Sequence, residues 1–124
     1  MKPAAAFARR EKADFTAVVG AGPGLTPAGD DMLCGFALAL ASRAPERLPE
    51  LAAACRPALG RTTDLSRHLL REALRGSFAW PLPNLLLALQ GRTEFAPALE
   101  LALSIGAGSG RDGAFGLYHG LRLL

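Results

Sequence analysis

The sequence has few aromatic residues and no long apolar run. Aromatic side chains make up 6% of the 124 residues, and β-branched residues are also scarce, which argues against a β-sheet. The longest apolar run, residues 32–41, covers about ten residues, whereas a membrane-spanning helix needs roughly 20. The first ten residues lack the apolar centre of a secretory signal. We therefore expect a cytoplasmic protein that has no contact with a membrane.

Charge and cysteine content exclude two further classes. The net charge is +3, but no run of lysine and arginine is present, so nucleic acid is not an expected partner. The only cysteines, Cys34 and Cys55, lie in apolar helical contexts. We predict that both are buried free thiols, as is usual in a reducing compartment.

Glycine and proline, by contrast, are abundant. The 14 glycines and nine prolines make up nearly a fifth of the chain, and alanine, leucine and arginine fill much of the remainder. Such a composition forms helices that are interrupted by breakers. It predicts one all-α domain, residues 1–124, with six or seven helices. The expected helices cover residues 3–17, 32–43, 46–59, 62–75, 84–90 and 94–105, and a last helix runs from a glycine loop at 106–113 to residue 124.

Two glycine-rich segments resemble each other, and each precedes a helix. Residues 20–24 (Gly-Ala-Gly-Pro-Gly) match residues 106–110 (Gly-Ala-Gly-Ser-Gly). In each unit a glycine follows an aspartate by four residues, namely Gly35 after Asp31 and Gly116 after Asp112. A glycine at that position leaves room for another helix to approach. We expect the two units to pack pseudo-symmetrically, with both loops and both aspartates at one end of the molecule.

The first loop does not fit the common phosphate-binding motifs. Gly24 and Gly29 have the spacing of a P-loop, but Asp30 and Asp31 stand where lysine and a hydroxyl residue are required. The dinucleotide fingerprint fails at Leu25, which stands where a glycine is needed. What remains is a helix start with exposed backbone N–H groups, which favours an anion or a carbonyl group. Either Thr26, followed by Pro27 as first helical residue, or Asp30 is expected to cap that helix.

The candidate site combines both loops. We expect a small anion to contact residues from each of them: Gly22, Gly24, Thr26, Gly29, Ser109, Gly110, Arg111 and Asp112. Asp30 and Asp31 are the candidate catalytic residues, and three roles stay open for them: helix capping, contact with a polar substrate, or binding of Mg²⁺ together with Asp112. The corresponding alternatives for the whole protein are a Mg²⁺-dependent helical hydrolase and a non-catalytic structural module.

The segment 62–75 is predicted to be an amphipathic helix. Leu65 and Leu69 are expected to face the core. His68 lies four residues from both Asp64 and Glu72, so local ion pairs are the simplest explanation of this histidine.

Residues 22–36 read Gly-Pro-Gly-Leu-Thr-Pro-Ala-Gly-Asp-Asp-Met-Leu-Cys-Gly-Phe. This segment resembles the hallmark of a bacterial family of unassigned function, the AllH-like family. The family includes a subunit associated with oxamate carbamoyltransferase of allantoin degradation. Weaker similarities at 62–66, 76–82 and 106–116 extend the resemblance to about residues 18–124.

The resemblance has implications for ligands and partners. Family members are longer and have an additional N-terminal region that this chain lacks, so the chain corresponds to their helical C-terminal part. The chemistry in the family is carbamoyl transfer between oxamate and carbamoyl phosphate by a multi-subunit enzyme. The resemblance therefore implies small carboxylates or acyl phosphates as ligands, and other subunits or a second copy of the chain as partners.

Overall fold

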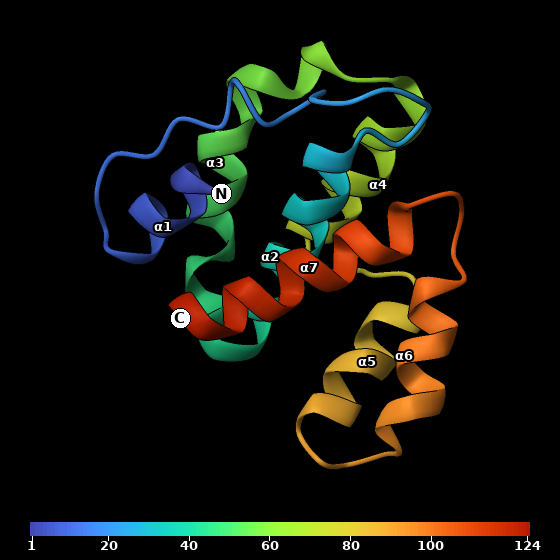
Figure 1. Ribbon diagram of the computed structural model, residues 1–124. Coiled ribbons are helices and arrows are strands. Elements are labelled where there is room, and N and C mark those ends of the chain that lie inside the picture. Colours follow the sequence, from blue (N-terminus) through green and yellow to red (C-terminus); the bar gives the residue numbers. More distant parts are fainter.

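The computed structural model describes residues 1–124 and contains helices but no strands (Figure 1). The all-α prediction is therefore confirmed. None of the helices combines the length and apolar character that crossing a membrane requires. The α-helices are α1 (Lys2–Ala8), α2 (Ala28–Arg43), α3 (Leu48–Cys55), α4 (Asp64–Leu74), α5 (Pro81–Leu89), α6 (Phe95–Leu103) and α7 (Ser109–Leu123). Two short 3₁₀ helices, Pro45–Arg47 and Arg56–Arg61, flank α3.

Helix α2 lies at the centre of the fold, as its uniformly apolar sequence indicates. Leu33, Phe36 and Leu40 are almost completely buried in the main core, which also contains residues of α1, α3 and α4. On its other side, Leu38 and Ala39 join a second core with residues of α5, α6 and α7. The two cysteines are free thiols, as predicted.

Helices α2 and α7 cross at glycines and touch through their backbones. A Cβ atom on Gly35 would overlap with the carbonyl oxygen of Gly113, and one on Gly116 would overlap with the carbonyl oxygen of Met32. Figure 1 shows α7 crossing α2 near the middle of the molecule. The predicted packing of the two glycine units against each other is thus observed, and the glycine four residues after each aspartate makes the contact.

The helix predicted for residues 3–17 ends at Ala8 instead. Arg10 adopts a positive φ of 62°, which stops the helix, and the side chain of Asp14 accepts a hydrogen bond from the backbone N–H of Thr16 at 2.9 Å. The turn that follows brings the ring of Phe15 into the core, 6.5 Å from the ring of Phe7. Burial of this phenylalanine therefore outweighs the local helical preference of residues 9–17.

The two glycine units start their helices earlier than predicted. Helix α2 begins at Ala28, and its N-cap is Pro27, so neither Thr26 nor Asp30 caps it. Helix α7 begins at Ser109, which places Arg111 and Asp112 in its first turn and not in a loop. Glycine at these positions does not break the helix because the lost Cβ atoms allow close packing, which compensates for the low helix propensity.

Other helix boundaries and one helix face also differ from the predictions, and the helix expected at 84–90 is α5, Pro81–Leu89. The single helix predicted for residues 46–59 is divided into the end of one 3₁₀ helix, α3 and the start of a second 3₁₀ helix. Pro45, Pro49 and Pro57 cause this division, because each lacks a backbone N–H donor. Helix α6 starts at Phe95 without a side-chain cap. On α4 the core contacts come from Leu70, Ala73 and Leu74, whereas Leu65 and Leu69 are exposed.

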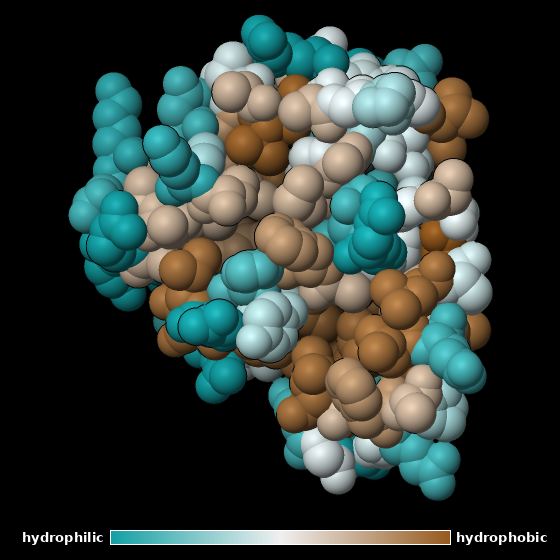
Figure 2. Space-filling view, viewed as in Figure 1, coloured by the Kyte–Doolittle hydropathy of each residue, from teal (hydrophilic) through white to brown (hydrophobic).

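Helices α5 and α6 form a hairpin that projects from the rest of the molecule (Figure 1). Its inner face contributes Leu85 and Ala102 to the core with Leu117 of α7. Several large apolar side chains remain exposed in and around it: Trp80, Leu89, Phe95, Leu101, Leu103 and Ile105. Figure 2 shows apolar side chains gathered in the part of the surface where Figure 1 places this hairpin.

The α2–α7 crossing yields a first prediction. Gly35→Ala adds a Cβ atom where the backbone of α7 lies, so the helices must separate and the free energy of unfolding should fall by about 3 kcal/mol. Urea denaturation followed by circular dichroism measures this loss. Gly60→Ala is the matched control, because a Cβ atom there meets nothing within 4 Å. Equal stability of the two variants would contradict the backbone contact.

Candidate functional site

The two glycine units meet at a pair of hydroxyl groups. The Oγ1 atom of Thr26 and the Oγ atom of Ser109 lie 2.6 Å apart and share a hydrogen bond, although 83 positions separate them in the sequence. Thr26 precedes α2, and Ser109 is the first residue of α7. The starts of the two crossing helices therefore lie together, at the end of the molecule where the sequence places both loops.

A cleft of about 500 Å³ opens beside this hydroxyl pair. The polar end contains Thr26, Asp31 and Ser109, and the remaining wall is largely apolar. Helix α4 forms one side, and the α5–α6 hairpin with the segment before it forms the other. The other lining residues are Cys34, His68, Leu69, Glu72, Ala73, Ser77, Phe78, Ala79, Leu82, Ala102, Ile105, Gly110 and Gly113.

Asp30 faces away from the cleft and serves the fold. Its buried carboxylate accepts hydrogen bonds from the backbone N–H of Gly20 at 2.8 Å, from the hydroxyl of Ser66 at 2.6 Å and from the hydroxyl of Thr62. These bonds attach the first glycine loop and the start of α4 to α2. Because its lone pairs are used inside the protein, Asp30 is not a candidate for contact with a ligand in the cleft.

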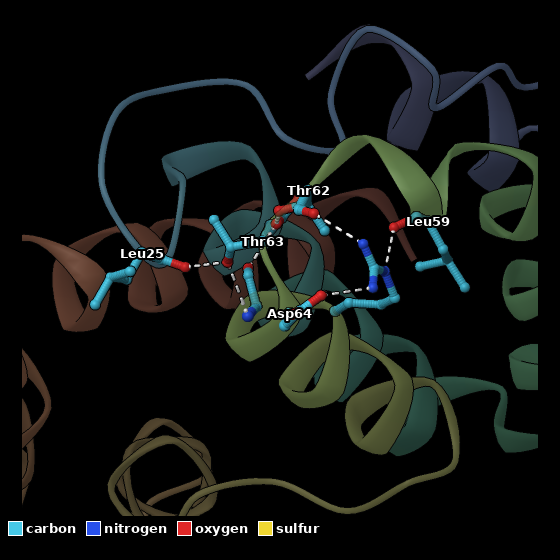
Figure 3. A network of polar contacts seen from close by, with 8 residues as sticks. Leu25, Leu59, Thr62, Thr63 and Asp64 are labelled. Atoms are coloured by element: carbon cyan, nitrogen blue, oxygen red, sulfur yellow. Dashed lines mark hydrogen bonds and ion pairs between the residues drawn. The ribbon is translucent and has the colours of Figure 1, made fainter.

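A second polar network holds the same loop from outside. The hydroxyl of Thr63 donates to the carbonyl oxygen of Leu25 and also accepts from the backbone N–H of Ser66, so it caps α4 and fixes the loop at once (Figure 3). Nearby, the guanidinium of Arg67 donates to the carbonyl oxygen of Leu59 at 2.7 Å and to that of Thr62 at 3.0 Å. The position of Thr26 at the cleft is thus set by contacts with α4.

Asp31 is the aspartate that lines the cleft. Burial raises the pKa of its carboxyl group to about 6, and the neighbouring charges of Asp112 and Asp30 act in the same direction. The hydroxyl groups of Ser109 and Thr26 offset part of this rise in pKa. One carboxylate oxygen, Oδ2, is buried and has no hydrogen-bond partner. An unpaired buried carboxylate oxygen is costly, so its presence at a cleft marks Asp31 as a candidate ligand contact.

The two helix starts differ in the backbone donors that they leave free. In α2, only the N–H of Ala28 lacks a backbone acceptor, because that of Gly29 donates to Ala21 and those of Asp30 and Asp31 donate to Pro27. In α7, the N–H groups of Ser109 and Arg111 have no backbone acceptor. The start of α7 is therefore the better place for an anion.

The other predicted site residues lie outside the cleft or serve packing. Gly22 and Gly24 are exposed in the first loop and have positive φ angles. Gly29 and Gly110 are buried against the carbonyl oxygens of Val18 and Ala102. Gly110 still lines the cleft, whereas the other three do not.

The charged residues of the second unit also stay outside the cleft. Arg111 is exposed, and its Nε atom lies 3.9 Å from an oxygen of Asp112. No group of three or more histidine, cysteine, aspartate or glutamate side chains is placed to hold a metal ion. The set Asp30, Asp31 and Asp112, considered for Mg²⁺, is thus not gathered around one point.

Sequence reasoning missed the contribution of α4 to the cleft. His68 and Glu72 both line it, but the sequence suggested only that they pair with each other and with Asp64. In the structure, Asp64 pairs with Arg67 and Glu72 pairs with Arg75. The four-residue spacing of His68 and Glu72 on one helix face was the available signal. Cys34 also lines the cleft, and burial raises the pKa of its thiol to about 12, so it is not a thiolate nucleophile at neutral pH.

The raised pKa of Asp31 yields a prediction for stability. The pKa of Asp31 is about 6 in the folded protein and near 3.8 in the unfolded chain. Its carboxyl group therefore favours the folded state at pH values below 3.8, and this contribution to the free energy of unfolding is lost as the pH rises through about 6. Asp31→Asn should therefore raise the free energy of unfolding at pH 8 by about 1 kcal/mol, a value reduced for partial exposure. At pH 4 the difference should vanish. Urea denaturation at the two pH values measures it.

Asp30→Asn is the matched comparison for this experiment. It places an amide N–H₂ group among donors that need an acceptor, so it should lower the free energy of unfolding at pH 8 by about 2 kcal/mol, opposite in sign to the effect of Asp31→Asn. An effect of Asp31→Asn that does not change between pH 4 and pH 8 contradicts the raised pKa.

Comparison with known proteins places the chain in a family. No solved structure matches it. A family model described as "Oxamate carbamoyltransferase subunit AllH" matches residues 18–121. The matched range includes both glycine units, α4 and the α5–α6 hairpin, and thus every residue that lines the cleft. The chain therefore belongs to the AllH family.

Proposed function

We propose that the chain binds a small anionic metabolite, a carboxylate or an acyl phosphate such as carbamoyl phosphate, in the cleft between the two glycine units. We further propose that it does so as one subunit of a carbamoyltransferase-type enzyme. The family is described as a subunit of oxamate carbamoyltransferase, which supports both the ligand class and the presence of protein partners.

The observation that carries this proposal is the meeting of Thr26 and Ser109 at the polar end of the cleft. A purely structural pair of loops has no need to place two hydroxyl groups and a carboxyl group with an unpaired oxygen at the edge of a cavity. The volume of about 500 Å³ lies within the range of roughly 300–1,000 Å³ that is usual for small-molecule sites.

The start of α7 supplies the attraction for the anion. The free backbone N–H groups of Ser109 and Arg111 and the positive end of the helix dipole favour negative charge there. The anionic end of the ligand therefore belongs at the backbone N–H groups of this helix start.

The exposed apolar side chains of the α5–α6 hairpin provide the surface for a partner subunit. Phe95, Leu101 and Leu103 are each more than 40% exposed on α6. Apolar side chains of this size on a projecting hairpin are typical of surfaces that another protein covers.

Binding is tested by isothermal titration calorimetry with oxamate and with carbamoyl phosphate, each with and without Mg²⁺. We expect both ligands to bind without Mg²⁺. Ser109→Ala should weaken binding about fivefold, because the hydrogen bond from the hydroxyl pair to the ligand is lost. Ser104→Ala is the control, since its hydroxyl bonds only to the carbonyl oxygen of Leu101 at the end of α6. If neither oxamate nor carbamoyl phosphate binds, the proposal is wrong and a structural module is favoured. If binding requires Mg²⁺, a metal site is favoured instead.

The partner surface is tested with the products of neighbouring genes. Leu103→Glu should abolish co-purification with a subunit encoded beside this chain, because a buried carboxylate in an apolar interface is costly. Glu100→Gln changes a charge on the same exposed helix and should leave co-purification intact. Retention of the partner by Leu103→Glu would place the contact elsewhere.

A further inference from the structure

The unpaired carboxylate oxygen of Asp31 is the one polar side-chain atom in the buried part of the structure without a hydrogen-bond partner. Asp31 is only partly buried as a residue, and it lines the cleft. Its terminal torsion joins an sp³ to an sp² carbon, so the carboxylate turns about the Cβ–Cγ bond with little resistance. A turn about this bond exchanges the two oxygens, so the carboxyl group can present either of them to an N–H donor of a ligand in the cleft.

The surroundings of Asp31 favour an amide as that donor. The hydroxyl groups of Thr26 and Ser109 share one hydrogen bond, in which one hydroxyl donates to the other. The accepting hydroxyl keeps its own hydrogen atom, which faces Asp31 in the free protein and is available to a carbonyl oxygen that enters the cleft. Donor and acceptor thus stand side by side at the polar end of the cleft. A primary amide or carbamoyl group presents the complementary pair, a carbonyl oxygen next to an N–H₂ group.

Other ligand groups match this arrangement less well. A metal ion requires several ligating side chains, and none of the acidic, histidine or cysteine residues are grouped in that way. A carboxylate offers only acceptors, so it would meet Asp31 with like charge and without a proton. An ammonium group offers only donors and leaves the hydroxyl hydrogen unused.

We infer that Asp31 is the residue by which the cleft selects its ligand, accepting a hydrogen bond from the N–H₂ group of a carboxamide or carbamoyl unit whose anionic end lies at the start of α7. Thr26 or Ser109 donates to the carbonyl oxygen of the same unit. This inference rests on the proposed function, because it assumes that the cleft binds a small anion.

Two pairs of ligands of equal charge and similar shape isolate the N–H₂ group. Oxamate and pyruvate differ by an N–H₂ group in place of a methyl group, and carbamoyl phosphate and acetyl phosphate differ in the same way. We expect the intact protein to bind the amide member of each pair on the order of 10-fold more tightly, since a hydrogen bond to a charged acceptor is formed. Isothermal titration calorimetry measures the four dissociation constants.

Asp31→Leu removes the acceptor at nearly constant side-chain shape and should reduce the preference to about twofold or less, while pyruvate still binds. Asp31→Ala removes the same acceptor with a side chain that any helix accommodates, so it replaces the leucine variant if circular dichroism shows that variant to be unfolded. Asp112→Asn is the control, because the equivalent aspartate of the second unit does not line the cleft, and it should keep the preference.

The outcomes distinguish a failure of this inference from a failure of the proposed function. If all four ligands bind the intact protein with equal affinity, or if both Asp31 variants keep the preference, selection by Asp31 is wrong and anion binding stands. If none of the four binds, both the proposed function and this inference are overturned.

Discussion

The backbone contact between α2 and α7 is the constraint on which the rest of the fold depends. Gly35 and Gly116 remove the two side chains that would keep these helices apart. As a result, the starts of the helices come close enough for Thr26 and Ser109 to share a hydrogen bond. The remaining elements pack on the crossed pair: α1, α3 and α4 complete one core, and α5 and α6 complete the other. The cleft lies where these two groups of helices leave the pair uncovered.

The adjacent aspartates Asp30 and Asp31 have different surroundings although they share one helix turn. Successive residues on a helix point about 100° apart. Asp30 therefore faces the loop and α4, where three donors satisfy it, while Asp31 faces α7 and the cleft, where one of its oxygens stays unpaired. Asp30 thus attaches the loop to α4, whereas Asp31 is the carboxyl group that a ligand in the cleft would meet.

Much of this arrangement could be predicted from the sequence, because the repeated Gly-Ala-Gly segment and the glycine after each aspartate are local signals of close packing. The end of α1 at Ala8 could not be predicted, since it depends on burial of Phe15 against Phe7. The separate roles of Asp30 and Asp31 also required the structure, because only the position of α4 decides which carboxylate is covered. The spacing of His68 and Glu72 places them on one face of α4, but only the position of that helix shows that this face lines the cleft.

The position of the α5–α6 hairpin has a consequence for how ligand and partner affect each other. One wall of the cleft, with Leu82 and Ile105, belongs to this hairpin or its connections, and the outer face of the same hairpin exposes Phe95 and Leu101. A protein that docks on the outer face and shifts the hairpin changes the width of the cleft. Ligand affinity and partner affinity are then thermodynamically linked. If the partner raises the affinity of the cleft for a ligand by some factor, the ligand raises the affinity for the partner by the same factor.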